Sequence, residues 1–253
     1  MKKCGVLIIG HGSRNESWVE LVEEAARQVD VPVPVVTGYL EIVEGRLIED
    51  GIRQLERAGV EKIIAVPLFV SSGSTHIAEI GYMLGAVDKL DLDEEIERIE
   101  TKAEIVYCEP MNDHPLVVDI LLERATELSA NPADEVLMIV GHGADEGEYH
   151  ERWEAVLQKI TPVVRRRAGF KGATYGTLHP DNAASRARAV TRKNRVIVVP
   201  MFLSEGYFTE TAIPSRLEGL HYTYSGKTYL PHPHVTRWLQ QVIEEQLAKE
   251  ERT

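Results

Sequence analysis

Apolar positions along this chain fall into two kinds of segment. Continuous apolar runs of strand length, such as residues 6–9 and 196–200, alternate with longer stretches in which apolar residues recur every three or four positions. Residues 18–29, 47–55 and 153–160 are stretches of the second kind, and their spacing places the apolar side chains on one face of a helix. Strands that are apolar throughout are typical of parallel sheets covered by helices on both faces. The pattern therefore predicts an α/β protein built from doubly wound parallel sheets.

Two strong motifs occur twice along the chain, in the same order. Residues 5–12 read GVLIIGHG, and residues 136–143 read VLMIVGHG. Residues 66–73 read VPLFVSSG, and residues 199–206 read VPMFLSEG. Each motif joins an apolar run to small or polar residues, as expected where a strand ends in a loop.

Two weaker similarities keep the same order. The segment 38–41, GYLE, corresponds to 176–179, GTLH, and the pairs at 114–115 and 232–233 both read His-Pro before a helix-like run. We interpret both His-Pro pairs as helix N-termini, where proline fixes the first turn. A metal-ligand cluster of His232 and His234 is the alternative.

The ordered recurrence predicts an internal duplication. A chain of 253 residues has room for two domains of ordinary size. The polar, proline-containing stretch 129–134 lies before the second copy of the motifs. We therefore expect two tandem domains, residues 1–130 and residues 131–253.

Composition narrows the class of protein. Apolar residues make up 43% of the chain and charged residues 27%, as in ordinary soluble proteins. No apolar run approaches the roughly 20 residues that a membrane span needs, and the N-terminus lacks the pattern of a signal peptide. The two cysteines form no disulfide framework or CxxC motif. We therefore expect a cytoplasmic protein with no membrane partner. Its net charge of −12 also argues against binding nucleic acid.

Candidate chemistry follows the predicted strands of the first half. His11 stands between two glycines after the first strand, Glu41 ends another, and the small polar loop 71–75 leads to His76. The carboxyl ends of parallel strands meet at one edge of the sheet, where ligands bind. Two imidazoles and a carboxylate there suit a divalent metal such as Fe, Co, Ni or Zn, or general acid–base work on an organic substrate. Serine hydrolase chemistry is disfavoured because no G-x-S-x-G motif occurs.

The motifs LIIGHGSR, YLEIVEG and VPLFVSSGSTHIAEI resemble the sirohydrochlorin chelatase family of the CbiX/SirB type, among the class II chelatases. The second half is similar through GHG, VPMFLSEG and PHPHVTRWL, as in two-domain members. The family inserts Co²⁺ or Fe²⁺ into sirohydrochlorin, in cobalamin or siroheme synthesis. The resemblance implies a chelatase-like fold, metal binding by His11 and His76, and assistance by Glu41.

As a chelatase, the protein would take the divalent metal as a substrate, with Ni²⁺ a further candidate, and would need no organic cofactor. Its partner would be a tetrapyrrole, and the sequence leaves both a monomer and a homodimer open. Carboxylates at the edge of the tetrapyrrole require hydroxyl, amide or guanidinium partners. The predicted partners are Ser13, Arg14, Arg46, Ser71, Ser72, Gly73, Ser74 and Thr75.

The second half departs from the pattern. His142 persists, but Thr209 stands at the position of His76, and His179 stands at that of Glu41. We therefore expect one working metal site, with a C-terminal half that is structural or cradles the substrate. A second metal site of His142 and His179 is the alternative. Two other functions stay open: a non-catalytic carrier of metal or tetrapyrrole that uses the same histidines, and a subunit of a larger chelatase.

Overall fold

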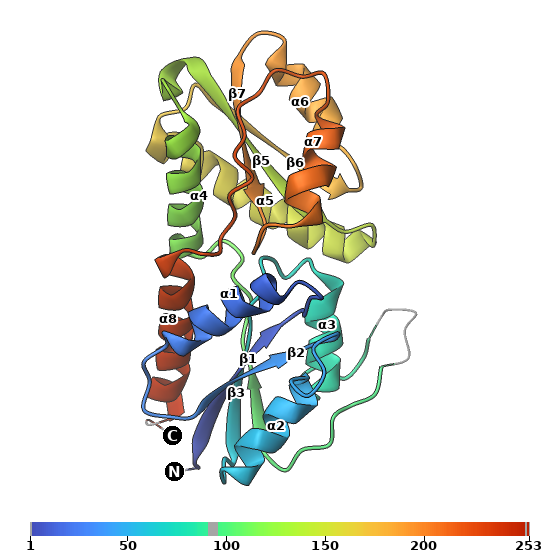
Figure 1. Ribbon diagram of the computed structural model, residues 1–253, viewed down its shortest axis with the longest axis vertical. Helices are drawn as coiled ribbons and strands as arrows, with labels where there is room; N and C mark the ends of the chain where they lie inside the picture. The colour runs from blue at the N-terminus through green and yellow to red at the C-terminus, as the bar shows by residue number, and fades with distance from the viewer. Residues whose placement is uncertain (1, 91–95, 251, 253) are drawn as a thin grey trace. The chain divides into compact units, whose positions relative to one another are not determined.

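A computed structural model of the chain describes residues 2–90, 96–250 and 252, and it contains two separate parallel sheets (Figure 1). The strands are β1 (Cys4–Gly10), β2 (Val35–Tyr39), β3 (Lys62–Pro67), β4 (Glu104–Tyr107), β5 (Glu135–Gly143), β6 (Gly172–His179) and β7 (Arg195–Met201). The α-helices are α1 (Glu16–Arg27), α2 (Ile48–Arg57), α3 (Thr75–Met83), α4 (Pro115–Leu128), α5 (Gly147–Ala168), α6 (Ala183–Thr191), α7 (Ile213–Arg216) and α8 (Pro233–Glu250). A 3₁₀ turn spans Pro132–Asp134, and a π-helical turn spans Phe208–Ala212.

The two sheets repeat one strand order. The first has the order β2-β1-β3-β4 and the second β6-β5-β7, and every pairing is parallel. Their registers correspond as well, since Gly10 lies opposite Tyr39 and Gly141 lies opposite Thr177. The predicted α/β fold and internal duplication are thereby confirmed.

Helices cover both faces of the first sheet. Side chains of α2 and α3 pack with alternate residues of β1 and β3, such as Leu7 and Ile63, in one buried cluster. On the other face α1 lies beside α8, where the Thr236 hydroxyl donates to the Ala25 carbonyl at 3.4 Å. Because both faces are buried, β1 is apolar throughout, as the sequence pattern predicts.

The second sheet is covered in the same manner. Helices α6 and α7 pack with Val136, Met138 and Val196 in a second buried cluster. Helix α5 lies with α4 on the other side, where Arg167 forms an ion pair of 2.7 Å with Asp119.

The two compact units do not divide at residue 130. One unit contains the described residues of Met1–Phe69, Thr75–Met111 and Val235–Thr253, and the other contains Val70–Ser74 and Asn112–His234. Helix α4, the last of the first half, therefore packs in the second unit, and most of α8, the last of the second half, packs in the first. A single cut near residue 130 separates the repeated sequences but not the packed units, because helix exchange leaves no mark on hydrophobic periodicity.

Candidate functional site

The turn that carries His11 depends on a glycine. Gly12 has a φ of +105°, and a Cβ there would lie 2.0 Å from the carbonyl oxygen of Glu41. The Leu40 amide donates to the Gly10 carbonyl at 2.9 Å, and the Glu41 amide donates to the His11 carbonyl at 3.1 Å. The loops after β1 and β2 are thus held together, and the sequence prediction that Glu41 lies near His11 holds.

A backbone contact determines which ring nitrogen of His11 carries the proton. Its Nδ1 lies 2.9 Å from the Gly12 carbonyl oxygen, which only accepts, so Nδ1 carries the proton. The lone pair of the neutral ring is then on Nε2. A backbone carbonyl that fixes the tautomer in this way is typical of metal-binding histidines.

His76 lies in the first turn of α3 and is oriented by a carboxylate. Its Nδ1 lies 2.9 Å from Oε2 of Glu79, one helical turn later, and the Glu79 side chain is only 9% exposed. Because a carboxylate accepts, Nδ1 donates and Nε2 again holds the lone pair. This is the carboxylate–histidine arrangement that supports a bound metal.

The electrostatics of Glu79 suit that role. Burial raises the pKa of the Glu79 carboxyl, but the hydrogen bond from His76, the charges of His76 and His11, and the Thr75 hydroxyl outweigh burial and lower it. Glu79 therefore stays ionised beside the ring of His76. Glu79 is not among the residues predicted from the sequence, although it stands three positions after His76 in a helical segment, a spacing that brings side chains together.

His11 and His76 lie side by side. Their ring centroids are 4.5 Å apart with an edge-on arrangement, and their side chains are 34% and 36% exposed. Oε1 of Glu41 lies 3.5 Å from Nε2 of His11. Both atoms are acceptors, so a proton or a cation between them makes their approach favourable. Within the described ranges, no three His, Cys, Asp or Glu side chains are grouped as a metal site, so the candidate ligand set is the histidine pair.

The predicted carboxylate-binding residues of the first loop differ in their surroundings. Arg14 is exposed, and the Ser13 hydroxyl accepts from the Asn15 amide at 3.0 Å. Arg46 lies over the Tyr39 ring and forms an ion pair of 3.2 Å with Glu23. An arginine engaged with a carboxylate has less attraction for a second one, so Arg14 is the stronger candidate.

The loop 71–75 combines structural and accessible positions. Ser71 is fully buried, and its hydroxyl accepts from the Gly73 amide at 3.0 Å. Gly73 is also buried, and a Cβ there would lie 2.5 Å from the Trp153 side chain. The geometry therefore assigns Ser71 and Gly73 to loop structure, in contrast to the substrate contacts expected from the sequence. Ser72, Ser74 and Thr75 are partly exposed.

The second half repeats the first turn with other side chains. A Cβ on Gly143 would lie 1.9 Å from the carbonyl oxygen of His179, just as one on Gly12 meets Glu41. The predicted correspondence of His179 with Glu41 is thus present in space. The rings of His142 and His179 stack with centroids 4.9 Å apart, and Nδ1 of His179 lies 3.4 Å from Asp145.

The residue that replaces His76 differs from the sequence expectation. Thr209 is buried, and its hydroxyl bonds to the backbone of Gly206. Phe208 instead meets His142 edge-on at 4.6 Å, as His76 meets His11. The helix after β7 begins with a π-helical turn, of which Phe208 is the first residue.

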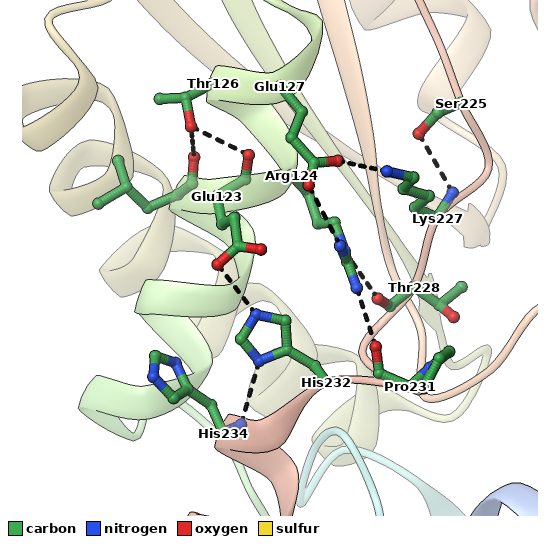
Figure 2. A network of polar contacts seen from close by, with 11 residues as sticks. Glu123, Arg124, Thr126, Glu127, Ser225, Lys227, Thr228, Pro231, His232 and His234 are labelled. Carbon is green, nitrogen blue, oxygen red and sulfur yellow. Dashed lines mark hydrogen bonds and ion pairs between the residues drawn. The ribbon is translucent and has the colours of Figure 1, made fainter.

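The His-Pro pairs form helix N-termini, as predicted. Nδ1 of His114 accepts from the Leu116 amide at 3.2 Å, and Nδ1 of His232 accepts from the His234 amide at 3.1 Å. Nε2 of His232 also lies 3.1 Å from Glu123 (Figure 2). Both ring nitrogens of His232 are therefore engaged within the protein, which favours a structural role over a ligand cluster.

A buried arginine, Arg124, lies close to the contacts of His232. Arg124 of α4 donates to the carbonyls of Thr228 and Pro231 at 3.1 and 3.2 Å, and Glu127 accepts from Lys227 at 2.7 Å (Figure 2). These contacts hold the segment before α8 against α4.

Two named chelatases are similar to this chain in sequence. The chain is 29% identical over 136 residues to a sirohydrochlorin cobaltochelatase of Methanopyrus kandleri, covering 48% of this chain and 94% of that protein. It is 27% identical over 174 residues to a sirohydrochlorin ferrochelatase of Priestia megaterium, covering 66% and 59%.

Solved structures share the whole fold. SirB from Bacillus subtilis with Fe³⁺ matches 99% of this chain and 98% of its own, with a TM-score of 0.72 and 18% identity. CbiX, described as the terminal enzyme for biosynthesis of siroheme in denitrifying bacteria, matches 95% and 98%, with a TM-score of 0.65 and 20% identity. The model of the CbiX family matches residues 5–128 and again residues 136–249. With two successive copies that together span most of its length, the chain belongs to the CbiX family.

Proposed function

We propose that this protein inserts Co²⁺ or Fe²⁺ into sirohydrochlorin, as a metal chelatase with one metal site in its first half. The ion is a substrate that His11 and His76 hold and then release to the ring nitrogens. Relatives named as sirohydrochlorin cobaltochelatase and ferrochelatase support the reaction class.

One observation carries the proposal: both histidines are set to present Nε2. His11 is fixed by a carbonyl and His76 by Glu79, while their rings lie 4.5 Å apart. Neutral imidazoles bind borderline divalent metals, and a pair leaves coordination positions open for the incoming nitrogens.

Insertion also releases two pyrrole protons. Glu41 is the candidate acceptor because its carboxylate lies 3.5 Å from Nε2 of His11 and its side chain is 55% exposed. The carboxylate lies near Nε2, the nitrogen that we assign to the metal, and not near Nδ1, so a role in orienting the His11 ring is disfavoured. A carboxylate at this place could accept protons from the pyrrole nitrogens as a general base.

The edge of the macrocycle carries carboxylates, and the accessible polar groups after β1 and β3 are the partners that we assign to them: Ser13, Arg14, Ser72, Ser74 and Thr75. Guanidinium and hydroxyl donors provide the local attraction that a protein of net charge −12 otherwise lacks.

The test is loss of the absorbance of metal-free sirohydrochlorin after adding Co²⁺ or Fe²⁺. His11→Ala and His76→Ala should each lower the insertion rate by more than about a hundredfold, since each removes one of two ligands. His142→Ala removes the histidine with the same backbone contact in the second half, and it should lower the insertion rate less than either first-half variant. Full activity in both first-half variants would overturn the assignment.

The alternative is a non-catalytic carrier of metal or tetrapyrrole that binds through the same histidines. A multiple-turnover assay separates the two, because a carrier releases at most one equivalent of metallated product per chain. The same assay with Ni²⁺ tests the third metal. No helix within the described residues is long and apolar enough to cross a membrane. Cytoplasmic location, the lack of an organic cofactor and a monomeric or homodimeric state stay predictions.

A further inference from the structure

The loops of the second half that correspond to the proposed metal-binding loops of the first half carry different side chains. Four positions change from polar or cationic to aromatic, acidic or apolar. Ser74 and Thr75 correspond to Tyr207 and Phe208, and Ser13 and Arg14 correspond to Ala144 and Asp145. The hydroxyls and the guanidinium that attract carboxylates are thus absent from this set of positions.

Aromatic rings gather in their place. The ring of Phe208 contacts His142 edge-on at 4.6 Å, Tyr207 edge-on at 5.5 Å and Phe202 in a stacked arrangement at 5.8 Å. His179 extends the group by stacking on His142 at 4.9 Å. We name these five residues the aromatic platform.

The platform is partly exposed to solvent. Tyr207 is 67% exposed, more than any other large apolar side chain among the described residues. Phe202, Phe208, His142 and His179 are half-buried. The Tyr207 ring contacts that of Phe208, and most of its surface faces solvent.

The charge around the platform decides which part of a ligand it accepts. Asp145 lies 3.4 Å from His179, and exposed Glu205 stands where the first half has Ser72. These carboxylates repel the acidic edge of a tetrapyrrole, whereas aromatic side chains attract a flat conjugated surface. A metal ion is disfavoured because the ring beside His142 is the phenyl ring of Phe208, whereas the ring beside His11 is the imidazole of His76.

We infer that the aromatic platform binds the flat conjugated face of the tetrapyrrole, with Tyr207 and Phe208 as its main contacts. The ligand class rests on the proposed function, but the platform has its own readout. Binding of the metal-free macrocycle involves neither His11 nor His76 as metal ligands.

The experiment titrates metal-free sirohydrochlorin into the full chain without divalent ions and follows its absorbance. Tyr207→Ala and Phe208→Leu should each raise Kd about five- to tenfold, as expected for loss of one ring contact. Tyr207→Phe keeps the ring and should stay within about twofold of the unaltered protein. Tyr82→Ala, near the far end of α3, is the control for loss of a tyrosine elsewhere.

Two results would overturn the inference: an unchanged Kd for Tyr207→Ala and Phe208→Leu, or an equal rise for Tyr82→Ala. Tyr207 is exposed, so its substitution tests the idea even if Phe208→Leu unfolds the protein. Failure of the proposed function would look different. If the protein binds sirohydrochlorin in a Tyr207-dependent manner but never inserts metal, the platform stands and the chelatase assignment falls.

Discussion

Replacing Glu79 tests whether the carboxylate behind His76 prepares the metal site. Its Oε2 lies 2.9 Å from Nδ1 of His76, and the side chain is 9% exposed, so solvent weakens this contact little. Glu79→Gln retains an acceptor for the ring proton but removes the negative charge. Glu79→Leu removes both.

The magnitude follows from the kind of hydrogen bond. A bond to a charged group contributes about 1.5–3 kcal/mol, which corresponds to roughly ten- to hundredfold in an equilibrium constant. Loss of a carboxylate that supports a metal-binding histidine has effects of the same size. We expect metal affinity and insertion rate to fall about tenfold in Glu79→Gln and about a hundredfold in Glu79→Leu.

The assay measures Co²⁺ affinity by calorimetry and insertion by the absorbance of sirohydrochlorin. Asp145→Asn is the matched control, because Asp145 faces His179 across 3.4 Å in the second half. It should leave the Co²⁺ affinity unchanged. Thermal unfolding of each variant separates loss of the site from loss of the fold.

Two outcomes would refute the reasoning. If Glu79→Leu folds and retains full metal affinity, the carboxylate does not support the ligand. If Asp145→Asn lowers the Co²⁺ affinity as much as Glu79→Gln, the proposed metal site is not confined to the first half.

Three further predictions concern the scaffold. Gly12→Ala should lower the free energy of unfolding by about 2–4 kcal/mol, because the new Cβ would clash with the Glu41 carbonyl. Gly45→Ala is the control, since Gly45 also has a positive φ but a Cβ there would have no neighbour within 4 Å, and it should lower the free energy of unfolding by only about 1 kcal/mol. Arg124→Met should cost about 2–4 kcal/mol in urea unfolding, since it leaves two backbone carbonyls without their donor, and an unchanged midpoint would contradict this. Burial raises the pKa of the Cys108 thiol to about 12, so at pH 8 iodoacetamide should label it only after unfolding; labelling of the native protein, read by mass spectrometry, would count against its burial.

Local pattern was enough to predict the strands, the first helices and the duplication. A strand buried on both faces must be apolar throughout, so residues 6–9 and 196–200 predict buried parallel strands. Likewise, the edge at which parallel strands end determines where loop side chains meet. The proximity of His11, Glu41 and His76 followed from that rule.

Other features needed the folded chain. Glu79 is one helical turn from His76, but only the structure shows that this carboxylate is buried and bonded to the ring. Position counting matched Thr209 with His76, but only the structure shows that the ring beside His142 is that of Phe208. The burial of Ser71 also came only from the structure, and it disfavours a contact with the substrate. In the sequence, a small polar residue that faces solvent cannot be told from one that faces its own loop.

The sequence by itself determined the repeated α/β architecture and the histidine pair, because periodicity and strand-end motifs are local properties of the chain. The tertiary structure decided how α4 and α8 are distributed between the units, which nitrogen of each histidine is presented, and which side chain stands beside His142. Packing between distant segments distributes the two helices, and the local geometry of the folded chain sets the contacts of each histidine. Residue spacing in the sequence does not reveal either of them.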